Sequence, residues 1–168
     1  MTSKSYFRIG TLLFLMLLPI RAYCGMTEDF NAMPHYLKGL EYGSKGEFKN
    51  VGEELKSCLE ISPECMPCKV ATGINRDVLE GKIKGNTAIH LFKGMDYQMN
   101  RDKGDAVAEF SEAISADPNY TGAYNFRAIE NFRNKKYEKA WEDIQKIQEL
   151  GGSVPPKLIE DVKKALGK

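Results

Sequence analysis

Histidine and long apolar segments are scarce in this chain of 168 residues. The two histidines, His35 and His90, and four cysteines offer few of the ligands that a tetrahedral zinc site takes from a protein. Both histidines stand four residues before a glycine, in equivalent surroundings, which favours a packing role over metal binding. The longest apolar segment, residues 9–18, has about half the length that a membrane-spanning helix needs. We therefore predict neither a metal site nor an integral membrane span in the mature chain.

Motifs that commonly carry catalysis are also absent. The sequence contains no glycine-rich phosphate loop, no nucleophile elbow, no HExxH and no paired-carboxylate motif. The net charge is +1, and removal of residues 1–24, which hold three basic residues and no acidic one, changes it to +1 − 3 = −2. A nearly neutral chain offers no electrostatic footprint for nucleic acid. We expect a protein that is not an enzyme, needs no cofactor and binds no nucleic acid.

The N-terminal segment has the organisation of an export signal. Lys4 and Arg8 form a positive region before the apolar segment, and Pro19 interrupts it. The tripeptide Ala-Tyr-Cys at 22–24 then offers the small residues that a signal peptidase requires. We predict a signal peptide at 1–24, with cleavage after residue 22 as the competing site, and export to the periplasm or the medium.

A lipoprotein anchor at Cys24 is the alternative for this segment. Lipid attachment favours small or aliphatic residues immediately before the cysteine, whereas Arg21 and Tyr23 stand there. The signal-peptide interpretation is therefore preferred, and residues 25–168 form the mature domain.

A pattern of small and large residues recurs three times in that domain. The second and third copies are contiguous, since Gly94 and Ala128 lie 128 − 94 = 34 residues apart. An insertion separates the first two copies, since Gly39 and Gly94 lie 94 − 39 = 55 residues apart, which equals 34 + 21. The equivalent positions are Gly39, Gly94 and Ala128; Tyr42, Tyr97 and Asn131; Val51, Ala106 and Ala140; Leu55, Phe110 and Ile144; Cys58, Ala113 and Ile147; and Pro63, Pro118 and Gly152.

This pattern resembles the tetratricopeptide repeat (TPR) family, whose helix-turn-helix repeat of about 34 residues is marked by small residues, aromatics and proline. The resemblance implies an all-α fold, a right-handed helical solenoid of about three hairpins in which each hairpin buries the apolar face of its neighbour. Within the domain we predict repeats at about 32–65, 87–120 and 121–152, an inserted helical segment at 66–86, and a C-terminal capping helix at 154–167.

Local signals indicate where the helices begin and end. A Lys-Gly-Glu turn at 45–47 and the prolines at 63 and 118 mark helix ends. No alternating strand pattern occurs, so we expect seven or eight helices. The insertion predicts one extra amphipathic helix, with a degenerate hairpin as the alternative. The hairpin helices are predicted at 33–44 and 48–61, 87–100 and 103–116, and 120–133 and 137–150.

The resemblance also implies a partner-binding surface. In TPR proteins the first helix of each hairpin lines a concave face that binds peptides or proteins. We therefore expect a non-catalytic adaptor of the cell envelope that binds a protein or peptide partner, with an oligomeric structural subunit as an alternative. The residues that the resemblance places on this face are Tyr36, Leu40, Leu91, Met95, Gln98, Asn125, Ile129, Phe132 and Arg133.

Cys58, Cys65 and Cys68 form the one reactive group of side chains that the sequence suggests. In an exported protein we expect a structural disulfide from Cys58 to Cys65 or to Cys68. The third cysteine keeps a thiol-redox protein as an alternative, although thioredoxin-type exchange uses a sheet that this sequence does not predict. A haem-carrying protein is a further alternative for the Cys65-x-x-Cys68 motif, but Lys69 follows it where histidine is usual.

Overall fold

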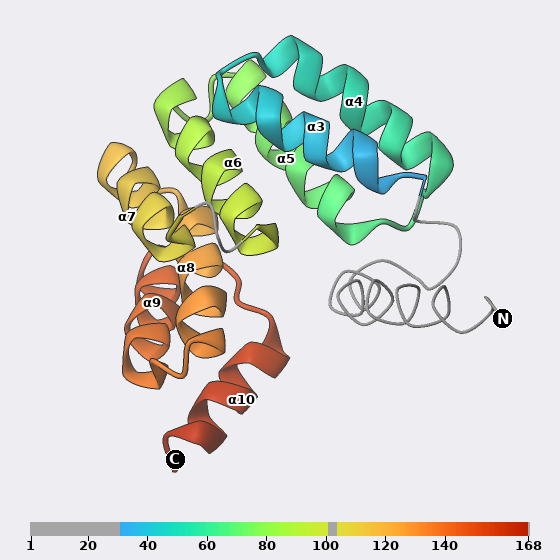
Figure 1. The fold of residues 1–168 in the computed structure, drawn as a ribbon. Coiled ribbons are helices and arrows are strands. Elements are labelled where there is room, and N and C mark those ends of the chain that lie inside the picture. The colour runs from blue at the N-terminus through green and yellow to red at the C-terminus, as the bar shows by residue number, and fades with distance from the viewer. Residues whose placement is uncertain (1–30, 101–103, 168) are drawn as a thin grey trace, which may run out of the picture.

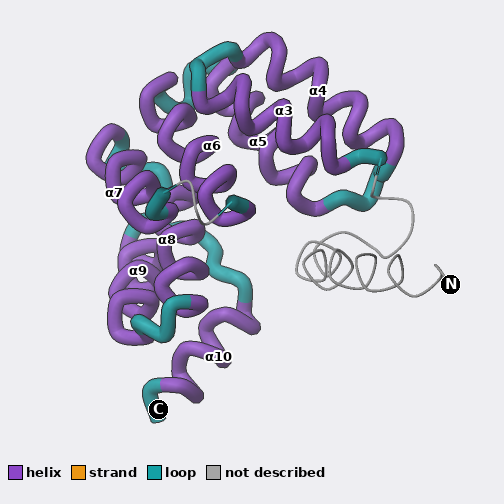
Figure 2. Tube along the Cα trace, in the orientation of Figure 1, coloured by secondary structure: helices purple, strands orange, loops and turns teal. Residues whose placement is uncertain are grey.

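The computed structural model of the protein describes residues 31–100 and 104–167. The predicted signal peptide lies outside the described residues. Within these ranges the chain forms eight α-helices and no strand, which confirms the all-α prediction (Figure 2). The helices are α3 (Met33–Ser44), α4 (Phe48–Ile61), α5 (Met66–Leu79), α6 (Gly85–Met99), α7 (Ala106–Ala116), α8 (Thr121–Arg133), α9 (Tyr137–Glu149) and α10 (Pro156–Ala165).

Helix boundaries follow the local sequence signals closely. Helices α3 and α4 span the predicted ranges, and Gly46 between them has the positive φ, 77°, expected at the end of a helix. Helix α7 begins at Ala106, later than predicted, because the Asp105 carboxylate accepts a hydrogen bond of 2.8 Å from the Val107 N–H and caps the helix there. The insertion contributes one helix, α5, and not a hairpin.

The recurring small residues lie where the two helices of a hairpin approach each other. A Cβ atom on Gly39 of α3 would lie 3.2 Å from Leu55 Cδ2 of α4. On Gly94 of α6, a Cβ atom would overlap the ring of Phe110 of α7. The third copy has Ala128 at this position, and that residue is fully buried. In the first two copies the large residue thus fills the space that the small residue sixteen positions earlier leaves open.

The hairpins pack on one another in two different ways. Helix α8 packs against α7, the preceding helix of the chain, whereas α6 packs directly against α3. Gly43 permits this close approach, because a Cβ atom there would overlap the Phe92 ring of α6. The inserted helix α5 packs mainly against α4.

Together the helices follow a curved path from α3 and α4 to α10, with α4, α7 and α9 on its outer side (Figure 1). One group of buried side chains comes from α3 to α7 and the start of α8, and a second comes from α8, α9 and the C-terminal segment. Ile114 packs against both groups. Helix α10 contacts α9 and buries Val162.

None of the helices in the described ranges is both long enough and apolar enough to cross a membrane.

Candidate functional site

Four of the nine residues predicted to contact a partner are buried. Tyr36 and Leu40 of α3, and Leu91 and Met95 of α6, belong to the hydrophobic core, so they do not line an accessible surface in this structure. The packing of α6 explains their position. Tyr36 and Leu40 share a helical stripe with Gly43, and Gly43 faces α6.

The three polar residues of the predicted set bond within the chain. The Gln98 side-chain amide donates to a Glu130 carboxylate oxygen at 3.1 Å, and Arg133 Nη1 lies 3.4 Å from the same oxygen. The Asn125 amide donates to the Ser153 carbonyl at 3.2 Å. These bonds connect α8 to α6 and to the segment before α10.

The two remaining residues of the set are half-buried on α8. Phe132 packs against the second core group, and its ring centroid lies 5.6 Å from that of Tyr137. Ile129 is also half-buried, so part of its side chain is exposed to solvent. The five residues of the predicted set that are partly exposed thus come from α6 and α8, and none comes from α3.

A hollow of the surface is lined by residues of α3 that lie one position after Tyr36 and Leu40. A hollow of about 520 Å³ is formed by the solvent-facing side of α3 and the last turn of α6. Since Gly39 faces α4 and Gly43 faces α6, the side of α3 left uncovered is the one that carries Leu37 and Glu41 in place of Tyr36 and Leu40. The lining residues are Pro34, Leu37, Lys38, Glu41, Ser44, Asp96 and Asn100.

The polar groups of this hollow are held by defined bonds. Glu41 pairs with Lys45 at 2.6 Å. The Ser44 hydroxyl donates to the Glu41 carbonyl at 2.7 Å, and the Asn100 amide donates to Asp96 Oδ1 at 2.8 Å. The Ser44 hydroxyl thus points to a backbone carbonyl and not to a base that could activate it.

A carboxylate on the second helix of each hairpin binds a nitrogen-bearing side chain on the first helix. Glu54 lies 2.6 Å from Lys38 Nζ and 2.7 Å from His35 Nδ1. Hydrogen bonds from Lys38 and then from His35 hold the pKa of the Glu54 carboxyl below its usual range. Glu109 repeats the contact with His90 Nδ1, also at 2.7 Å. Both histidines therefore have a polar partner, which the sequence did not predict.

In the third hairpin the equivalent pair is more deeply buried. Arg127 Nη2 lies 2.6 Å from Asp143 Oδ1, and its Nε donates to both carboxylate oxygens, at 3.2 and 3.1 Å. Asn131 donates to Asp143 Oδ2 at 3.3 Å, and Arg127 Nη1 donates to the Ser111 hydroxyl at 3.1 Å. The Asp143 side chain is only 4% exposed. This network fixes α8 against α9 and α7.

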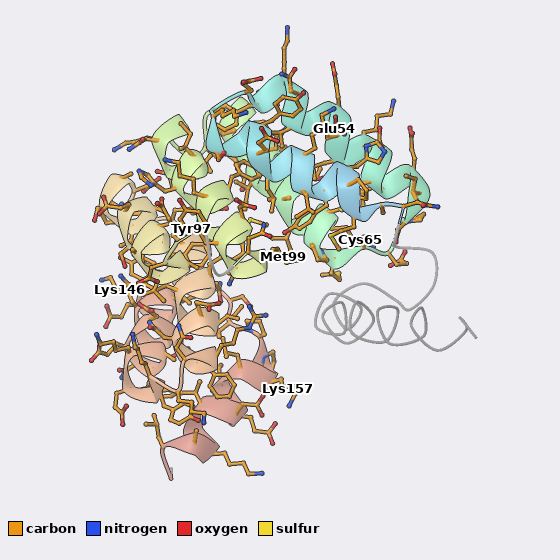
Figure 3. The ribbon with its side chains drawn as sticks, in the orientation of Figure 1. Glu54, Cys65, Tyr97, Met99, Lys146 and Lys157 are labelled. Atoms are coloured by element: carbon orange, nitrogen blue, oxygen red, sulfur yellow. A yellow bond between two sulfur atoms is a disulfide. The ribbon has the colours of Figure 1, made fainter. Side chains whose placement is uncertain are left out.

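The three cysteines of the mature domain lie together at the junction of α4 and α5. Cys58 of α4 and Cys68 of α5 form a disulfide, with a Cα–Cα distance of 6.5 Å, so one of the two predicted pairings is present. Cys65 stands at the N-cap position of α5, and its sulfur lies 3.2 Å from that of Cys68. Figure 3 shows Cys65 at this end of α5. All three residues are buried.

This arrangement bears on the haem alternative. The Cys68 sulfur is already bonded to Cys58, and Lys69 Nζ pairs with Glu64 at 2.8 Å. In this state the sulfur of Cys68, the second cysteine of the motif, is therefore not available to bond to a haem group.

Comparison with protein families, with curated proteins and with solved structures finds no match to this chain.

Proposed function

We propose that the protein is an exported, non-catalytic binding scaffold of the TPR type, and that it holds a segment of a protein partner in the hollow between α3 and α6. The observation that carries the proposal is the hollow itself, about 520 Å³ in volume, between the first helices of two successive hairpins. Its volume lies in the range of roughly 300–1,000 Å³ in which proteins bind ligands.

The lining suits a peptide. Pro34 and Leu37 supply apolar contact area, while Glu41, Asp96 and Asn100 supply carboxylate and amide groups of the kind that bond to a peptide backbone. With one lysine and two acidic residues, the lining has a net charge of +1 − 2 = −1. We therefore expect a neutral or basic segment to bind better than an acidic one.

The chemistry of the hollow supports a binding role over a catalytic one. Ser44 is the one hydroxyl side chain in the lining, and its hydrogen bond goes to a backbone carbonyl. Nucleophilic catalysis requires a base within hydrogen-bond reach of the nucleophile. The ordered lining instead offers fixed donors and acceptors to a ligand.

Site-specific photo-crosslinking tests the proposal. A photoreactive amino acid at position 37, in full-length protein expressed in its own host, should crosslink a partner, whereas the same group at Lys49, an exposed residue of α4, should not. The crosslinked segment is identified by mass spectrometry and made as a peptide. If positions 37 and 49 yield the same products, the hollow is not the binding site.

Titration with that peptide then tests the role of charge. Asp96→Lys changes the lining from −1 to +1 and should weaken binding of a neutral or basic segment by about tenfold or more, which corresponds to roughly 1.4 kcal/mol. Lys49→Glu is the control and should bind as the unaltered protein does. Circular dichroism establishes that both variants keep their helices. Equal affinity of the Asp96→Lys variant would count against a peptide bound in this hollow.

A further inference from the structure

The cysteine cluster contains more than a structural crosslink. Cys58, Cys65 and Cys68 place their three sulfur atoms within 4.8 Å of one another. Cys58 and Cys68 share the disulfide, and the thiol of Cys65 lies beside it, 3.2 Å from the Cys68 sulfur. A disulfide bond is about 2.05 Å long, so the Cys65 and Cys68 sulfurs need to approach by only about 1.1 Å to become bonded.

We propose that the cluster is a thiol–disulfide exchange site in which Cys68 alternates between Cys58 and Cys65. The Cys65 thiolate attacks the Cys68 sulfur, and a Cys65–Cys68 bond forms as the Cys58–Cys68 bond breaks. The electron pair of the broken bond leaves on the Cys58 sulfur, which takes up the proton that Cys65 has lost. Both sides of the reaction contain one disulfide and one thiol, so the step needs no oxidant or reductant.

The position of the three residues favours exchange within the cluster. Cys65 is the N-cap residue of α5 and Cys68 lies in its first turn, so a bond between them requires no movement of α4. The relative exposure of Cys58, Cys65 and Cys68 is 0, 3 and 0%, which keeps thiols from solution away from the disulfide. Reaction between groups already held in contact is favoured over reaction with a molecule from solution.

Exchange would change how α5 is attached. The Cys58–Cys68 bond joins two helices and closes a sequence separation of ten residues. A Cys65–Cys68 bond closes a separation of three, 68 − 65, between the N-cap and the first turn of α5. The attachment of α5 to α4 would then rest on non-covalent contacts, and the shorter loop would constrain the unfolded chain less. The form with the Cys65–Cys68 bond should therefore be the less stable of the two.

The test maps the disulfides of the full chain carrying Cys24→Ser, so that these three cysteines are the only ones present. Acid quenching, unfolding and alkylation preserve the pairing. Digestion after glutamate then yields peptide 55–60 with Cys58 and peptide 65–80 with Cys65 and Cys68. A Cys58–Cys68 bond joins the two peptides, whereas a Cys65–Cys68 bond lies within peptide 65–80 and leaves Cys58 alkylated. Cys65→Ser and Cys58→Ser provide the reference masses of the two forms.

We expect both forms in one preparation, with the Cys58–Cys68 form more abundant. Each form, separated by chromatography under acid and returned to neutral buffer without added thiol or oxidant, should regenerate the same mixture. Finding the Cys58–Cys68 form alone would overturn the proposal. So would two forms that remain as separated, because that result indicates two products of oxidation and not an exchange.

Discussion

The ion pair between Arg127 and Asp143 should be the most sensitive polar contact of the fold. Replacement by Arg127→Met removes the donors that reach both oxygens of a carboxylate only 4% exposed. The amide of Asn131, at 3.3 Å, stays in place, but a single neutral donor cannot replace the lost charge. Breaking one side of a buried pair costs about 3–5 kcal/mol. A domain of this size is stable by only about 5–15 kcal/mol, so the loss is a large fraction of the total.

Urea unfolding, followed by circular dichroism at neutral pH, measures this loss as a lower midpoint. The first hairpin offers a matched control, because Lys38 occupies the position of Arg127 and binds Glu54. There the side chains are 54% and 15% exposed, and an ion pair that is screened by solvent in this way contributes little to stability. Lys38→Met should therefore lower the midpoint only slightly. Because Lys38 and Arg127 occupy the same position of the repeat and are both replaced by Met, a difference between the two variants reports the effect of burial.

A double variant, Arg127→Met with Asp143→Leu, tests the physical reason for the loss. Removing both charges leaves no buried carboxylate without its cation, so the double variant should be more stable than Arg127→Met alone. Two results would refute the reasoning. One is a cost below about 1 kcal/mol for Arg127→Met, which is typical of a solvated pair. The other is a double variant whose loss is the sum of the two single losses, since coupled partners are not additive.

Three further predictions follow from the packing and the titrating groups. Gly43→Ala places a methyl group into the Phe92 ring and should lower the free energy of unfolding by about 1–3 kcal/mol. Gly73→Ala has no atom within 4 Å of the new methyl group and should raise it by about 0.5–1 kcal/mol. The two variants should therefore shift the urea midpoint in opposite directions. Folding lowers the pKa of Glu54, so its carboxylate stabilises the fold at pH values above the unfolded pKa of about 4.3. This stabilisation is lost as the pH falls through the pKa of the folded state. The stability difference from Glu54→Gln should therefore shrink in acid, and a constant difference would contradict the pairing. Burial, reinforced by a carboxylate, raises the pKa of Tyr120 to about 12, so the neutral form contributes stability below about pH 10 that is lost as pH rises towards the folded value. Ultraviolet titration should show a late tyrosine step that Tyr120→Phe removes.

The hairpins could be predicted because their signals are local. Gly39 and Gly94 each face a large side chain sixteen residues later, and this separation is fixed by two helices and a short turn. The approach of α6 to α3 depends instead on how the chain returns after the insertion. One signal could have revealed it: Gly43 has Gln98 and Phe132 at the equivalent places of the other copies. A second glycine on α3 alone indicates a second close helix neighbour.

The candidate site was harder to predict because it depends on that same approach. Once α6 covers Tyr36 and Leu40, the open side of α3 carries Leu37 and Glu41, a shift of one residue. The disulfide shows the same limit. Sequence spacing allowed Cys58 to pair with either of two cysteines, and the choice depends on which side of the first turn of α5 faces α4.

The insertion accounts for both regions that the structure singles out. Helix α5 packs on α4 much as α8 packs on α7, so the helix that follows each of these two hairpins in the chain covers its second helix. Since α5 already lies against α4, α6 packs against α3. The hollow lies beside this contact, between α3 with Leu37 and the last turn of α6 with Asp96. The same helix brings Cys65 and Cys68 to Cys58. Both proposed activities therefore depend on the helix that interrupts the repeat.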